Sequence, residues 1–87
     1  MSEATTTTDH EVIRNWAEAR GGKPARVKGT GKDGGILRIE FDAPEEGLEE
    51  ISWNDFFRIF EENELAFLHQ DLTEDGGTSR FNKLVDR

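Results

Sequence analysis

The chain has 87 residues, too few for a barrel or a doubly wound enzyme fold, which need roughly 150 to 250 residues. Hydrophobic residues make up only 33%, the formal net charge is −8, and cysteine is absent. Disulfide-stapled folds and Cys-ligated zinc folds are therefore excluded, and a protein that coats polyanions through its overall charge is disfavoured. Because there is no long apolar run and no leader-like N-terminus, we expect one small cytoplasmic domain with a thin core.

The net charge is the difference between segments of opposite sign. Residues 14 to 38 carry a net charge of +5, residues 39 to 75 carry −12, and residues 76 to 87 return to +2. In the folded domain these segments either form separate patches that attract a partner of opposite sign or neutralise each other.

The N-terminal region is expected to be a disordered polar tail over residues 1 to 7, followed by a helix. Thr8 and Glu11 have the spacing of a capping box, and Asp9 adds a negative charge at the positive end of the helix dipole. The helix is expected from about residue 9 to residue 20, with Gly21 as its stop. Its narrow apolar stripe consists of Val12, Ile13, Trp16 and Ala17.

A glycine-rich stretch follows the first helix, with six of the nine glycines between residues 21 and 35. This composition predicts a loop that contains a short strand at residues 25 to 28 and a turn at Asp33-Gly34. Residues 36 to 41 alternate between apolar and charged side chains, which predicts the second strand of an antiparallel hairpin. Its solvated face would carry Arg38 and Glu40.

The clearest helix signal lies at residues 53 to 62. Ser52 and Asp55 form a second capping box, Ile51 and Phe56 are spaced as a hydrophobic staple, and Asn63 is a plausible cap at the other end. A short apolar run at residues 65 to 70 then predicts a buried strand. Residues 79 to 85 fit a helical face and a closing strand nearly equally well. The apolar face of the second helix consists of Trp53, Phe56, Phe57 and Phe60.

These elements predict an α+β fold class. The expected domain covers residues 8 to 87 in the order α-β-β-α-β plus a short C-terminal element, with two amphipathic helices on one face of a small, mostly antiparallel sheet. Its expected core consists of Trp16, Leu37, Ile39, Phe41, Phe56, Phe57, Phe60, Phe67 and Leu68.

Three segments carry a resemblance, namely residues 13–25, 51–57 and 79–85. They look like the corresponding parts of a family of uncharacterised small acidic prokaryotic proteins, and the resemblance covers about residues 9 to 87. Some members carry the label glucan branching enzyme. That activity needs a large barrel with paired carboxylates, which 87 residues cannot form. The resemblance therefore implies no activity and no functional residue.

Sequence motifs for chemistry are weak. Residues 71 to 82 follow the oxygen-ligand spacing of a calcium loop, but Asn82 replaces the bidentate Glu and a strand precedes the segment, so an acidic turn is expected. Lys23 and Lys32 follow glycines without the rest of a phosphate-binding loop. We therefore expect no enzymatic activity, and no catalytic, cofactor-binding or metal site.

The remaining candidate is a basic, glycine-rich surface around residues 20 to 32. The main expectation is a protein-interaction or accessory module that is monomeric or weakly self-associating, with patches of opposite charge steering its partner. The alternative is an accessory protein that contacts nucleic-acid phosphates, although the loop has no aromatic residue to stack on a base. The candidate anion-binding or partner-binding residues are Arg14, Arg20, Lys23, Arg26, Lys28 and Lys32.

Overall fold

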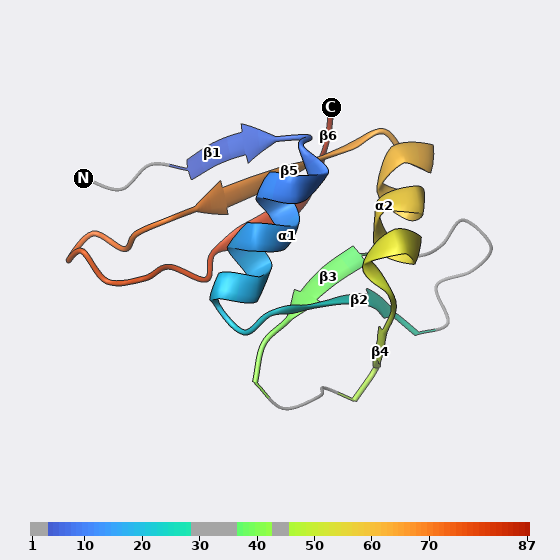
Figure 1. Cartoon of the computed structure of the whole chain (residues 1–87), viewed down its shortest axis with the longest axis horizontal. Coiled ribbons are helices and arrows are strands. Elements are labelled where there is room, and N and C mark those ends of the chain that lie inside the picture. Colours follow the sequence, from blue (N-terminus) through green and yellow to red (C-terminus); the bar gives the residue numbers. More distant parts are fainter. Residues whose placement is uncertain (1–3, 29–36, 43–45) are drawn as a thin grey trace.

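The structure is a computed structural model that describes residues 4–28, 37–42 and 46–87 (Figure 1). Within these residues the chain forms two helices and six strands, which confirms the α+β class. The turn expected at Asp33-Gly34 lies outside the described residues. In chain order the elements are β1 (Ala4–Thr7), α1 (His10–Ala19), β2 (Lys23–Val27), β3 (Leu37–Glu40), β4 (Leu48–Glu50), α2 (Trp53–Glu62), β5 (Leu65–Gln70) and β6 (Asn82–Asp86).

The strands form two antiparallel sheets rather than the single sheet that was expected. One sheet has the order β1-β5-β6 and the other the order β3-β2-β4. The expected hairpin is present as β2 and β3, which pair from Lys23 opposite Glu40 to Arg26 opposite Leu37. The C-terminal segment, left open between helix and strand, is strand β6 on β5. β2 and β5 are the central strands of these two sheets.

Two strands were not expected. Residues 4 to 7 were predicted to belong to a disordered tail, but in the structure they form β1, which pairs with β5. Ala4 lies opposite Gln70 and Thr7 opposite Phe67. Threonine favours extended backbone, and β5 supplies the hydrogen-bonding edge that an isolated polar tail would lack. Strand β4 is only three residues long and pairs with β2.

Helix α1 begins one residue later than the Thr8 capping box predicts. Asp9 is the N-cap, and its carboxylate accepts hydrogen bonds from the amides of Glu11 (2.9 Å) and Val12 (3.2 Å). The negative charge of Asp9 also lies at the positive end of the helix dipole, which favours it over a threonine hydroxyl. The expected stop is confirmed, because Gly21 has a φ of 72°.

Helix α2 has the bounds that its sequence predicts. Ser52 is the N-cap and its hydroxyl accepts from the amide of Asp55 at 3.0 Å, while Asn63 is the C-cap. Phe56, Ile59 and Phe60 of this helix are buried. Phe57 was expected in the core but lies only partly buried at its edge.

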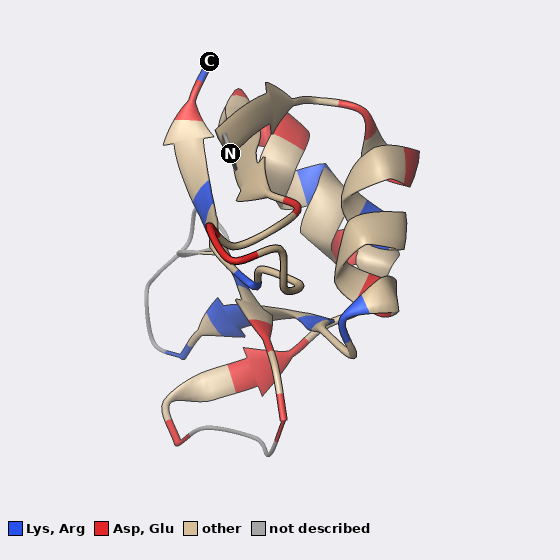
Figure 2. Cartoon of the chain, turned by 90° about the vertical axis from the view of Figure 1, so that its left-hand side faces the viewer, with Lys and Arg blue, Asp and Glu red and all other residues tan. Residues whose placement is uncertain are grey.

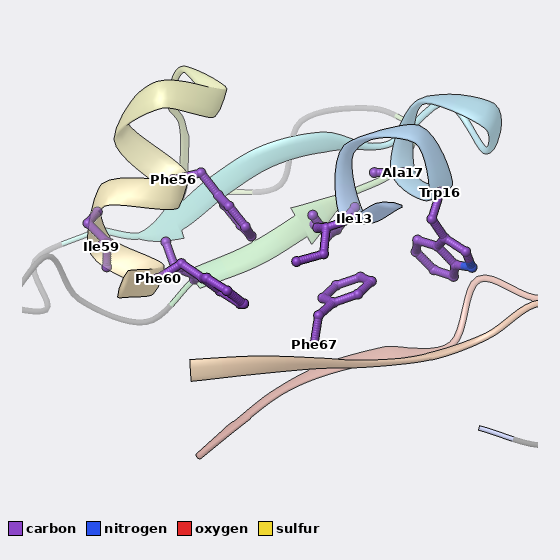
Figure 3. Close-up of a cluster of buried hydrophobic side chains, with 9 residues drawn as sticks. Ile13, Trp16, Ala17, Phe56, Ile59, Phe60 and Phe67 are labelled. Carbon is purple, nitrogen blue, oxygen red and sulfur yellow. The ribbon is translucent and has the colours of Figure 1, made fainter. Parts of the chain in front are cut away.

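The core lies between the helices and the two sheets (Figure 3). Phe67 points from β5 toward Ile13 and Trp16 of α1, and Phe56 and Phe60 enter from α2. Gly22 is part of this packing, because a Cβ at this position would lie 2.7 Å from the Ile39 side chain and 3.1 Å from the Ala17 carbonyl oxygen. Of the other expected core residues, Phe41 and Leu68 are also only partly buried.

Glu40 departs from the strand pattern. It was expected on a solvated face, but only 6% of its surface is exposed. The expectation was wrong at the end of β3, a strand that contacts β6 of the other sheet, whereas Arg38 on the same face of β3 is exposed as expected.

Candidate partner-binding groove

A groove runs beside α1, between its outward face and the first half of α2. Its first part is an open hollow of about 510 Å³ lined by the α1 residues His10, Glu11, Arg14, Asn15 and Glu18 and by Phe57 of α2. Glu11, Arg14, Asn15 and Glu18 are spaced i, i+3, i+4 and i+7, so that they form one polar wall along the helix. The opposite wall is aromatic.

The second part of the groove is a hollow of about 410 Å³ between the end of α1, the start of β2 and the N-terminus of α2. Glu18 lines both hollows, so that the two parts adjoin. Trp53, Ile51 and Pro24 supply apolar surface here, and Lys23 and Glu50 supply charge. The groove is open and elongated, which suits a segment of polypeptide better than an enclosed small molecule.

The aromatic wall is a stack of three rings. Trp53 and Phe57 lie nearly parallel, with ring centroids 5.4 Å apart, and Phe57 stacks on His10 at 4.1 Å with an interplanar angle of 5°. Phe56 and Phe60 meet Phe57 edge-on from the core side. Because buried phenyl rings hold the stack from behind, its outward edge is rigid, and rigid aromatic surface binds a partner at a low cost in conformational entropy.

His10 is also fixed by a hydrogen bond at the other end of α2. Its Nε2 lies 2.7 Å from Oε2 of Glu61, and the same carboxylate oxygen lies 2.8 Å from the Arg87 guanidinium. The hydrogen bond from His10, followed by that from Arg87, lowers the pKa of the Glu61 carboxyl below its usual value. Glu61 is therefore held ionised, and it ties α1, α2 and the end of β6 together.

Three of the six candidate basic residues are paired with carboxylates. Arg26 of β2 lies opposite Glu49 of β4 in the sheet and its Nε donates to Glu49 Oε1 at 2.6 Å. Lys23 Nζ lies 4.0 Å from Glu50 Oε1, and Arg14 Nε lies 3.3 Å from Glu18 Oε2. Figure 2 shows basic β2 beside acidic β4. These acids neutralise part of the +5 segment within the domain.

Arg20 is engaged with the protein backbone. Its guanidinium donates to the carbonyl oxygens of Ser79 (2.6 Å), Asp71 (3.0 Å) and Trp16 (3.0 Å), and it lies over the Trp16 ring at 4.2 Å. Arg20 therefore clamps the β5–β6 connection onto the end of α1, and its donors are directed at carbonyl groups rather than at solvent.

The last two candidates do not enlarge the basic surface. Lys28 is exposed at the end of β2, and Lys32 lies outside the described residues. The described candidates therefore do not form one open basic patch. Instead, Arg14 and Lys23 lie in the groove, each facing a glutamate.

The charge left over in the groove is negative. Arg14 faces Glu18 and Lys23 faces Glu50, whereas Glu11 has no ion pair with any of the residues that the structure describes. The groove thus combines an aromatic wall with one uncompensated carboxylate on its polar wall. This combination favours a bound partner that presents an apolar side chain next to a cationic one.

The expected acidic turn connects β5 and β6. Thr73 Oγ1 donates to the Asp75 carboxylate, which also accepts from the Gly77 amide at 3.3 Å. The Thr73 hydroxyl, followed by the Gly77 amide, lowers the pKa of Asp75. The segment is a strand connection rather than a loop between helices. Among the described residues no three His, Asp or Glu side chains gather as metal ligands.

Comparisons with known proteins do not assign the chain to a family. No family model matches the chain, and neither a curated protein nor a solved structure is significantly similar to it. Membership of the family of small acidic prokaryotic proteins therefore stays a prediction. Within the described part of the chain, neither helix has the length and apolar composition to cross a membrane.

The sequence patterns did not predict the groove. Phe57 was assigned to the core because it fits the apolar spacing of α2, and Glu11 was considered only as part of a cap. The available signal was the number of aromatic residues on α2. Trp53, Phe56, Phe57 and Phe60 span more of the helix surface than a narrow buried stripe requires.

Proposed function

We propose that the chain is a small, non-enzymatic protein-binding module of the cytoplasm, and that the groove beside α1 takes a segment of a partner protein. The observation that carries the proposal is the rigid stack of Trp53, Phe57 and His10 along one wall of the groove. Aromatic side chains that are half-buried and held from behind are typical of the residues that dominate binding energy at protein interfaces.

The bound segment carries an apolar side chain that packs against Trp53 and Phe57, and a lysine or arginine that reaches Glu11. The net charge of −8 supports this choice, because it steers cationic segments toward the domain. The pairing of Arg14, Lys23 and Arg26 with glutamates argues against the nucleic-acid alternative, since phosphates would have to displace those carboxylates.

Selection from a displayed peptide library tests the proposal. We expect the chain to enrich peptides with an apolar residue beside a basic one, and Trp53→Ala to weaken their binding at least ~10-fold, equivalent to about 1.4 kcal/mol. Affinities are measured by calorimetry at a temperature at which circular dichroism shows each variant folded.

Leu72→Ala is the matched control, because Leu72 is 52% exposed in the β5–β6 connection and does not line the groove. Its affinity for the peptides should equal that of the wild type. The proposal fails if no peptide is enriched, or if the enriched peptides bind Trp53→Ala as tightly as the wild-type chain.

A further inference from the structure

The sheet β1-β5-β6 has a second face that neither helix covers. Phe67 projects from β5 into the core, where α1 and α2 lie (Figure 3). Leu84 of β6 lies opposite Phe67 and packs against the same core. Since successive residues of a strand point to opposite sides, the outward positions on β5 and β6 include Ala66, Leu68 and Val85. Ala66, on the central strand, is only 3% exposed, while Leu68 and Val85 are half-buried. Ala4 and Thr6 continue this surface onto β1, where Thr6 lies opposite Leu68.

This surface, called here the outer face, extends beyond β6 to Phe81. The Gln70 amide donates to the Phe81 carbonyl at 3.1 Å, next to the pair formed by His69 and Asn82. The alternation then places Phe81 beside Gln70, and its side chain is 49% exposed. The outer face consists of Ala4, Thr6, Ala66, Leu68, Gln70, Phe81, Lys83 and Val85.

The outer face has the composition of a covered surface. In an antiparallel sheet with one solvent-exposed face, apolar and polar residues alternate along each strand. In β5, however, residues 65 to 68 are all apolar, and in β6 both Leu84 and Val85 are apolar. Such runs are typical of strands that are buried on both sides. Within the described chain the helices supply cover for one side only.

Charge favours a second copy of this chain as the cover. The outward positions of β1, β5 and β6 carry no Asp or Glu, although the chain has 19 acidic residues, and Lys83 is their only charged side chain. Two molecules of charge −8 repel each other wherever acids meet. A two-fold axis would join two outer faces, and the acidic strand β4 belongs to the other sheet.

We propose that the outer face is the contact surface of a weak homodimer, in which two β1-β5-β6 sheets pack face to face. Three strands about 4.8 Å apart with about five residues each cover roughly 14 by 17 Å. This area is well below the area that each partner buries in a standard protein–protein interface. The dimer is therefore concentration-dependent. It uses a different surface from the groove, so that the failure of one proposal leaves the other in place.

Sedimentation equilibrium of the full chain tests the dimer, over about 5 to 500 μM protein at an ionic strength of about 0.15 M. We expect the average mass to rise with concentration from 9.9 kDa toward twice that value. Phe81→Asp places an acid on the outer face at an exposed position, and we expect it to weaken association at least ~10-fold without unfolding the domain.

Val12→Asp is the control, because Val12 is a comparably exposed apolar residue, 42% accessible, on α1. It should dimerise as the wild type does. A wild-type chain that stays monomeric at every concentration overturns the proposal. So does a dimer that Phe81→Asp leaves unchanged, or one that both variants weaken equally.

Discussion

Phe67→Ala should lower the free energy of unfolding by about 3–5 kcal/mol, comparable to the whole stability of a domain of this size. Phe67 has no exposed surface. It joins β5 to α1 through an edge-on contact with Trp16 at 5.4 Å, and within β5 it stacks on His69 at 5.6 Å. Removing the ring leaves a cavity between the sheet and the helix that neither can close without losing its own contacts. Urea denaturation followed by circular dichroism measures the loss.

Phe81→Ala is the control for this prediction, because it removes the same ring from the residue that immediately precedes β6, the neighbour of β5. Phe81 is 49% exposed, so we expect a loss of less than about 1 kcal/mol when the protein is dilute enough to be monomeric. Equal losses for the two variants would contradict the assignment of Phe67 to the buried face of the sheet and of Phe81 to the outer face.

Arg20→Ala should cost about 2 kcal/mol of stability, a large effect for a side chain that is not fully buried. The substitution leaves three carbonyl oxygens, those of Ser79, Asp71 and Trp16, without their charged donor and removes the cation from the Trp16 ring. The β5–β6 connection would lose its attachment to α1. Thermal and urea unfolding of the variant give the magnitude.

Arg14→Ala and Arg20→Lys separate this structural role from a role in binding anions. Arg14 makes one exposed i,i+4 ion pair with Glu18, so its removal should cost about 0.5 kcal/mol or less. Arg20→Lys keeps the charge but loses the planar fork, so we expect it to be nearly as unstable as Arg20→Ala. Full stability of Arg20→Lys would show that the charge matters and the clamp does not.

The sequence is most informative where local interactions decide the structure. Helix α2 has the bounds that its Ser52 cap and aromatic spacing predict, and the β2–β3 hairpin follows from the alternation of residues 36 to 41. These signals lie within a few residues of each other, so that local propensity and burial agree. Gly21 ends α1 for the same reason.

The features that were missed depend on pairing between distant segments. The threonines of β1 have no alternation of their own, and they become a strand only because β5 lies beside them. Counting charges along the chain could not reveal that Arg26 lies opposite Glu49, or that Arg20 reaches Asp71 and Ser79. For this reason the basic segment looked like a binding surface, whereas the groove beside α1 was not anticipated.

Amide NMR spectra of the labelled chain provide the most direct test of the central claim, which is that peptide partners bind at the groove and that the basic residues do not form a nucleic-acid-binding surface. The spectra are recorded with a peptide from the library selection and separately with a DNA duplex at about 50 mM salt. We expect the peptide to shift the signals of Glu11, Glu18, Phe57 and the Trp53 indole, with little change at the buried Trp16 indole. The duplex should shift none. Shifts that gather along β2 with the duplex, while the groove signals stay in place with the peptide, would contradict the account.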